Sequence, residues 1–315
     1  MKGYRDQNHK TFQPFNPLTL KLLFFFALIL SWSCSTRAVP EPQYLPSAGL
    51  LDIVKGFHRL AREDLYRFPI PKDATGTNIM KATLSRLEEF EKRYPGRFSD
   101  IIQFTKAAAY ERLRDYDQAI ALYEGVARSN GRLGAEAAKN LEALKSFQHV
   151  AQGPRPAQEP AEYLSGLEEK IAAWSELTRK YQGTAYQYLA QVEEEKGERA
   201  KVAFLEQSRQ RLKEGSQLVI FSYSQLVTKH RQSKNLYRHL LDFGDFYALL
   251  AKEYGAQREP EGLSFDPETF DQLAKSALRL YTEVAQEDGI MEKIQAQGKI
   301  ESLRALMEKT RRLGR

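Results

Sequence analysis

The sequence contains a single cysteine, Cys34, among its 315 residues. A disulfide within the chain is therefore excluded, and a folded state must be stabilised by a hydrophobic core. Long apolar runs are also scarce: the run at 22–30, LLFFFALIL, is well short of the ~20 residues that span a bilayer. Alternating runs of Val, Ile and Thr, which strands require, are few. These absences favour a helical, globular chain.

Sequence signatures of common enzyme classes are absent as well. The chain has no phosphate-binding loop, no G-x-G-x-x-G, no H-E-x-x-H and no G-x-S-x-G. We therefore predict no cofactor and no enzymatic activity. The formal net charge is +6, and residues 1–33 hold four basic residues and one acidic residue, so their removal leaves +3. No concentrated basic face is present, which argues against nucleic acid as a partner.

The N-terminal segment has the organisation of a secretory signal. Residues 1–21 are polar and basic, the apolar run 22–30 follows, and small residues come next. The position of Cys34 resembles the lipobox of bacterial lipoproteins, in which the cysteine is acylated and becomes the first mature residue. Ser33 fits that pattern, whereas Leu30 lies four residues before the cysteine instead of three. The resemblance implies a signal peptide at 1–33 and lipidation of Cys34, and Ser35 in place of Asp implies the outer membrane.

Two alternatives to a lipid anchor remain open for this segment. The first is cleavage after Ala38 and release as a soluble secreted or periplasmic protein; the second is an uncleaved anchor with a free cysteine. The Pro-rich residues 34–47 are expected to form an extended tether ahead of the folded part.

The stretch 98–145 organises the rest of the chain. Ala119, Leu122, Tyr123 and Val126 follow one another at i, i+3, i+4 and i+7, which places them on one face of a helix. Helical periods also precede and follow this helix. A pair of helices of this size cannot bury its apolar face alone, so further helices must pack on it.

This stretch resembles a tetratricopeptide repeat. Tyr110 lies nine residues before Ala119, Tyr123 four after it and Val126 seven after it, and Pro95 closes the preceding helix. Three positions depart from the repeat: Ala107 replaces its Gly, Lys106 its Leu and Gly131 its Pro. The resemblance is closest to degenerate repeats of periplasmic assembly lipoproteins. It implies an all-α fold of stacked antiparallel hairpins, a solenoid of about ten to eleven helices.

Apolar periodicity predicts helices throughout the remaining chain. A Pro- and Gly-rich linker at 151–160 separates an N-terminal repeat region, 48–150, from a C-terminal one, 161–315. Ala277, Leu280, Tyr281 and Val284 repeat the stripe of Ala119 after 158 residues, which indicates an internal repeat. The expected helices are 50–67, 78–94, 134–149, 163–181, 185–213 with Gly197 as a candidate break, 217–228, 235–254, 267–286 and 290–312; segment 217–228 also has strand propensity.

Three groups of residues are candidate sites of chemistry. His239, Asp242 and Asp245 follow one another at three-residue steps and could offer metal ligands; the preferred interpretation is surface or capping groups near Gly244. The acidic run at 193–195, with Lys196 and Arg199, is interpreted as a solvated helix face in preference to a cation site. A peptidoglycan hydrolase with two carboxylates in a cleft at 235–267 is retained as an alternative.

Together these observations predict a non-enzymatic, membrane-anchored helical scaffold that binds a protein or peptide partner in the bacterial cell envelope. In tetratricopeptide repeats the inner groove is formed mostly by the first helix of each pair. Gln103, Lys106, Tyr110 and Arg114 are therefore the predicted groove residues. The sequence leaves the identity of the partner and the oligomeric state open.

Overall fold

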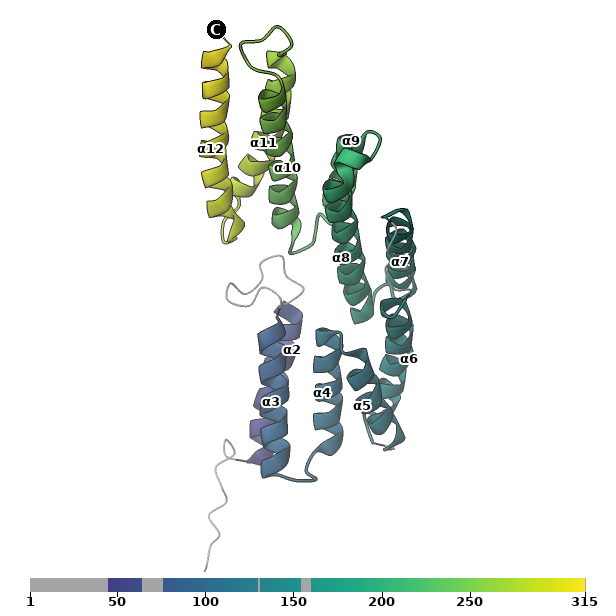
Figure 1. The fold of residues 1–315 in the computed structure, drawn as a ribbon. Helices are drawn as coiled ribbons and strands as arrows, with labels where there is room; N and C mark the ends of the chain where they lie inside the picture. The colour runs from purple at the N-terminus through teal and green to yellow at the C-terminus, as the bar shows by residue number, and fades with distance from the viewer. Residues whose placement is uncertain (1–44, 64–75, 130, 154–159, 315) are drawn as a thin grey trace, which may run out of the picture. The chain divides into compact units, whose positions relative to one another are not determined.

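The computed structural model describes residues 45–63, 76–129, 131–153 and 160–314 (Figure 1). Over these ranges every regular element is a helix, so the prediction of an all-α fold is confirmed. The predicted signal peptide and Cys34 lie outside the described residues. The helices are α2 (Pro46–Glu63), α3 (Thr77–Arg93), α4 (Ser99–Leu113), α5 (Tyr116–Arg128), α6 (Gly134–Ala151), α7 (Pro160–Lys180), α8 (Ala185–Ser208), α9 (Gly215–Lys229), α10 (Leu236–Gln257), α11 (Pro267–Gln286) and α12 (Glu292–Leu313).

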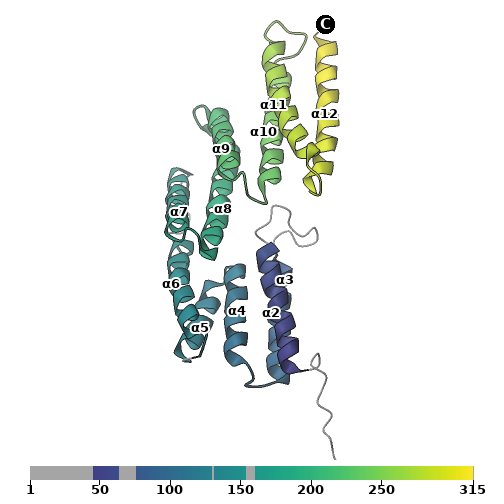
Figure 2. The same cartoon turned by 180° about the vertical axis from the view of Figure 1, so that it is seen from behind.

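Consecutive helices from α3 to α12 pack against one another. In the organising stretch, α4, α5 and α6 lie side by side (Figures 1 and 2). Arg114 ends α4 with a left-handed backbone, φ 64°, and the carboxylate of Asp115 then accepts a hydrogen bond from the Gln118 amide to cap α5. The predicted stripe faces the core: Ala119, Tyr123 and Val126 are buried.

The internal repeat predicted from the sequence occupies equivalent core positions near the C-terminus. Helix α11 begins at Pro267 and is capped by Asp266, whose carboxylate accepts from the amides of Glu268 and Thr269. Each of the two repeated tyrosines donates a hydrogen bond to a carboxylate of a preceding helix. Tyr123 donates to Glu111 of α4 at 3.3 Å, and Tyr281 donates to Asp245 of α10 at 2.7 Å.

The predicted boundary at 151–160 falls between α6 and α7. Side chains from both sides of it share one hydrophobic cluster, in which Phe147 of α6 makes edge-to-face contacts with Trp174 of α7 and Tyr186 of α8. A second large cluster is formed by α8 to α12, with Leu226, Leu240 and Phe246 at its centre. Packing therefore continues across the predicted boundary at 151–160.

One expected helix feature differs from the structure, and one ambiguous segment is resolved as a helix. Helix α8 runs through Gly197 without a break and ends at Ser208, where a short 3-10 turn (Arg209–Arg211) replaces its expected last residues. A Cβ atom at Gly197 would lie 2.8 Å from Cγ1 of Ile171, so this glycine lets α7 approach α8 closely. Segment 217–228, with its strand propensity, lies in helix α9, because tertiary packing on α8 and α10 buries its stripe of Val219, Tyr223 and Leu226.

Candidate functional site

The four predicted groove residues make contacts with neighbouring helices. Gln103 and Lys106 of α4 both bind the carboxylate of Glu91 on α3, at 2.8 and 2.7 Å. Arg114 contacts α8 instead: its Nε lies 2.7 Å from Oε1 of Glu193. Tyr110 is half-buried against two apolar clusters. The structure thus brings Gln103 and Lys106 together and places Arg114 in a separate contact; their role in binding a partner stays a prediction.

The three candidate metal ligands on α10 do not converge. His239 is 1% exposed and binds Glu195, so its interpretation as a surface or capping group is wrong. Asp242 pairs with Arg238 and Arg199 at 3.0 and 3.5 Å. Among the residues that the structure describes, no group of three or more His, Cys, Asp or Glu side chains is placed to hold a metal ion.

A hollow of about 260 Å³ lies beside Asp242 and Asp245, in the segment where the hydrolase alternative placed its carboxylates. Asp245 accepts from the Tyr281 hydroxyl and pairs with Lys299 at 2.8 Å. Burial raises the pKa of Asp242, and the charges of Arg238 and Arg199 only partly oppose this effect. Each carboxylate is thus engaged by side chains of its own chain.

The acidic run at 193–195 on α8 is packed against neighbouring helices, contrary to the prediction of a solvated face. Glu194 and Glu195 are 2% and 5% exposed, so the expected solvated face is instead an interior contact. Glu193 is half-buried as well and pairs with Arg114. Three consecutive helical residues span about 200° at about 100° per residue, so they cannot all lie on one solvated side. The spacing of the three glutamates in the sequence therefore already indicates that at least one of them faces a neighbouring helix.

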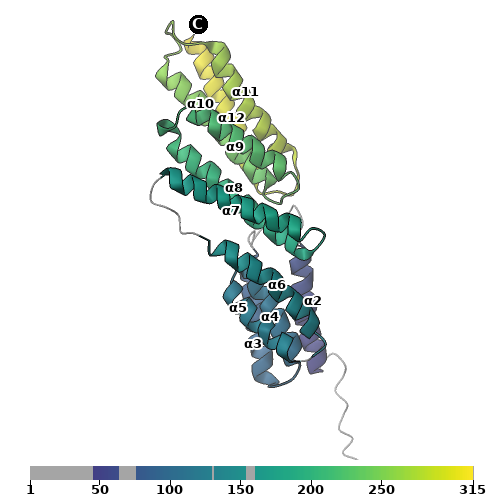
Figure 3. The same cartoon turned by 90° about the vertical axis from the view of Figure 1, so that its right-hand side faces the viewer.

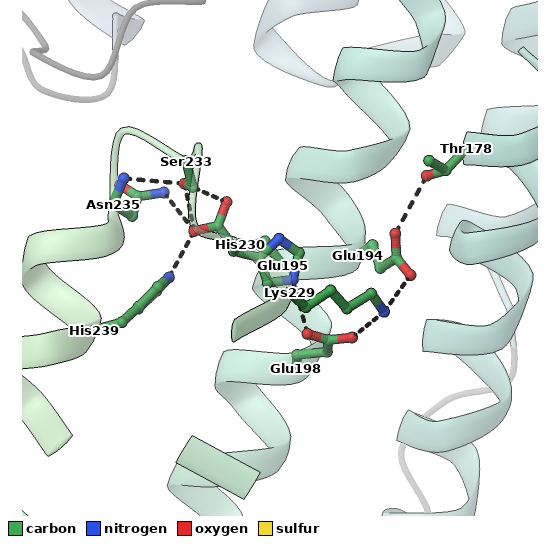
Figure 4. A network of polar contacts seen from close by, with 9 residues as sticks. All are labelled: Thr178, Glu194, Glu195, Glu198, Lys229, His230, Ser233, Asn235 and His239. Carbon is green, nitrogen blue, oxygen red and sulfur yellow. Dashed lines mark hydrogen bonds and ion pairs between the residues drawn. The ribbon is translucent and has the colours of Figure 1, made fainter. Parts of the chain in front are cut away.

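Glu195 holds the turn between α9 and α10 (Figure 4). Its Oε1 lies 2.6 Å from Nε2 of His239, and its two oxygens lie 2.7 and 2.8 Å from the Ser233 hydroxyl, which donates to them. Asn235 Nδ2 donates to the same carboxylate at 3.3 Å. A buried carboxylate with several donors is satisfied, and α8 is thereby joined to the start of α10.

A second half of this network joins α8 to α7 and to the end of α9 (Figure 4). Lys229 Nζ lies 2.6 Å from Oε1 of Glu194 and also pairs with Glu198. His230 Nε2 lies 2.8 Å from Oε2 of Glu198. On the other side, the Thr178 hydroxyl of α7 donates to Glu194 at 3.3 Å.

The electrostatics of the network fix its charges. Burial acts to raise the pKa of Glu195, but hydrogen bonds from His239 and Ser233 outweigh burial and hold this pKa below its ordinary value. Glu198 behaves alike: hydrogen bonds from His230 and Lys229 overcome burial and lower its pKa. Burial acts to lower the pKa of Lys229, and its bonds to Glu194 and Glu198 raise it overall. A general acid or base needs a pKa near the working pH, and these groups are moved away from it.

Beside the network, two hollows follow α8 and form one groove. The first, of about 520 Å³, is lined by the C-terminal half of α7, the residues from Tyr188 to Glu195 on α8, and the turn 229–235. The second, of about 390 Å³, is lined by the middle of α7, the middle of α8 and the C-terminal half of α9. Ser175 and Lys229 line both hollows, so the two adjoin. We call this the α8 groove; α7 and α9 flank α8 in Figure 3.

Comparison with protein-family models and with curated proteins gives no match to this chain. Within the described ranges, no helix combines the length and the apolar character needed to cross a membrane.

Proposed function

We propose that this chain is a non-enzymatic scaffold of the bacterial cell envelope, which binds a protein partner and is held at the outer membrane by a lipid on Cys34. The observation that carries the proposal is the α8 groove, a long open hollow whose buried carboxylates Glu194 and Glu195 already contact Lys229 and His239 of the same chain. Such a hollow offers a shaped surface for a partner segment. The stacking of consecutive helices supports a repeat-like, solenoidal scaffold.

The charged side chains that line the groove are fixed in their ionised states, which supports a role without catalysis. Glu195 and Glu198 have lowered pKa values and Lys229 a raised one, so at neutral pH all three stay ionised. Their nearest partners are side chains of the same network. Groups fixed in this way stabilise a helix packing and are poorly suited to transfer protons.

The anchor is argued from the sequence. The lipobox-like position of Cys34 and the Pro-rich tether after it would keep the folded part close to a membrane. The alternative is release as a soluble protein after cleavage behind Ala38. The lipidated and the soluble protein differ in the mass of the mature chain, in labelling by fatty acid and in partitioning between membrane and soluble fractions.

Membrane fractionation of the wild type and of Cys34→Ala tests the proposal. We expect the wild type in the outer-membrane fraction, labelled by palmitate, and the variant unprocessed and unlabelled. Cross-linking of the wild-type envelope, followed by mass spectrometry, should capture an envelope protein. Soluble wild type and variant, both cleaved after Ala38, would contradict the anchor, and activity of the purified chain on sacculi would contradict the scaffold.

A further inference from the structure

We propose that the α8 groove binds an extended peptide segment that has an acidic end and an apolar end. This inference rests on the proposed scaffold function and specifies the chemistry of its partner. Two features of the lining carry it: exposed arginines at one end of the groove and apolar side chains at the other.

The end of the groove near the α9–α10 turn has exposed positive charge. Arg179 and Arg231 line the first hollow and are exposed, and neither forms an ion pair with another residue of 160–314. The two acids of this hollow are already engaged within the chain, Glu194 by Lys229 and Glu195 by its contacts with His239 and Ser233. A ligand entering here therefore meets two available guanidinium groups, which bind carboxylates well.

The other end of the groove combines apolar side chains with a charged rim, which includes Glu168, Glu198 and Lys201. Ile171, Val202 and Leu226 line the second hollow. On α9, Leu218 and Phe221 are 43% and 60% exposed. They lie one turn before Ser222 and Gln225, which line the same hollow, so all four share a side of the helix. Two exposed large apolar side chains beside a hollow are typical of a binding surface.

The dimensions fit a short segment of chain. The α8 lining extends from Tyr188 to Val202, about 21 Å at ~1.5 Å per residue. An extended peptide rises ~3.3 Å per residue, so about six residues fill this length. A small anion would occupy only the arginine end and leave the apolar end uncovered. Two adjoining hollows in succession along α8 therefore favour a peptide.

The test measures binding of short fluorescent peptides to the full chain purified from membranes, by fluorescence anisotropy at low salt. One peptide has a leucine-rich half followed by a glutamate-rich half; a second has glutamine in place of each glutamate. We expect the acidic peptide alone to bind, with an affinity that falls as salt is raised. Free glutamate at the same carboxylate concentration should not displace it, since it cannot cover the apolar end.

Charge reversal of the two arginines gives the decisive comparison. Arg179→Glu with Arg231→Glu should weaken binding by about tenfold or more. Lys252→Glu with Lys309→Glu is the matched control, since both lysines are exposed, lie outside the groove lining and make the same change in net charge. Phe221→Ala should weaken binding by about threefold or more through the apolar end. Circular dichroism and urea midpoints establish that each variant is folded.

Three results would overturn the inference: equal binding of the acidic and glutamine peptides, equal effects of the two double variants, or no binding of the acidic peptide. Complete displacement by free glutamate would identify a small-anion site instead. Each of these results leaves the scaffold proposal standing if envelope cross-linking still captures a partner. Conversely, a soluble wild-type chain contradicts the anchor without affecting peptide binding.

Discussion

Oε1 of Glu195 on α8 and Nε2 of His239 on α10 lie 2.6 Å apart, and both side chains are buried. Forty-four residues separate the two positions in the sequence. The Ser233 hydroxyl and the Asn235 side chain donate to the same carboxylate. This contact joins α8 to α10 beside the α8 groove.

Removal of the Glu195 carboxylate should destabilise the chain strongly. Glu195→Ala leaves His239, Ser233 and Asn235 without their acceptor, and the loss of one partner of a buried charged contact costs about 3 kcal/mol or more. Urea unfolding followed by circular dichroism measures the change. Glu169→Ala, an exposed position on α7, is the control and should change the free energy of unfolding by about 0.5 kcal/mol or less. Equal costs for the two variants would contradict the account.

The network should also make the free energy of unfolding depend on pH in the acidic range. The pKa values of Glu195 and Glu198 are lowered in the folded state, so the folded chain holds fewer protons than the unfolded chain. Their stabilisation is present above the ordinary glutamate pKa and is lost as pH falls through the lowered values. The urea midpoint of the wild type should therefore fall on acidification below about pH 4.3. Glu195→Gln should flatten this fall; an unchanged slope would argue against the network.

Glu111 should show the opposite pH dependence. Burial raises the pKa of Glu111, and the charge of Arg112 and the hydroxyls of Tyr186 and Tyr123 only partly offset it. A carboxyl group whose pKa is raised in the folded state stabilises the fold fully at a pH below its ordinary pKa. This stabilisation is lost as the pH rises through the raised pKa. Glu111→Gln removes this loss, so the variant should gain stability relative to the wild type, on the order of 1 kcal/mol, between pH 4 and pH 8. A difference that is constant with pH would contradict the assignment.

Packing of α10 on α11 predicts a penalty at Gly244. A Cβ atom there would lie 2.6 Å from Cε1 of Tyr281, a rigid ring, so Gly244→Ala should cost about 1–3 kcal/mol. Gly298→Ala on α12 is the matched control: it is helical and exposed, and nothing lies near its added methyl group. The control should gain about 0.5–1 kcal/mol. Thermal unfolding compares the two variants, which should shift in opposite directions.

Much of the fold could be predicted because its signals are local. The stripe of Ala119, Tyr123 and Val126 and its repeat after 158 residues are buried as expected, and α11 has the expected bounds. Periodicity and capping residues act within a few positions of one another, so a sequence pattern reveals them. The hydrogen bonds of the repeated tyrosines to Glu111 and Asp245 add a shared feature that periodicity does not encode.

The candidate site was harder to predict because its contacts link distant positions. Glu195 finds its partners 38 to 44 residues later, on a turn and on the next helix. A run of charges gives no information on which neighbouring helix covers it, and the usual expectation for such a run is solvent. The burial of His239 has the same origin. The groove likewise arises from the packing of α7, α8 and α9, and the residues at 103–114 predicted from the repeat pattern are not part of its lining.

The most direct test of the central claim is site-specific photo-cross-linking in living cells, with the photoreactive residue introduced at Phe221 beside the groove or at Lys309 outside it. The account predicts an adduct with an envelope protein from position 221 and none from position 309. The captured protein should present an acidic, partly apolar segment, and Arg179→Glu with Arg231→Glu should abolish the adduct. Equal cross-linking from both positions, or an adduct that survives the charge reversal, would contradict the role of the α8 groove.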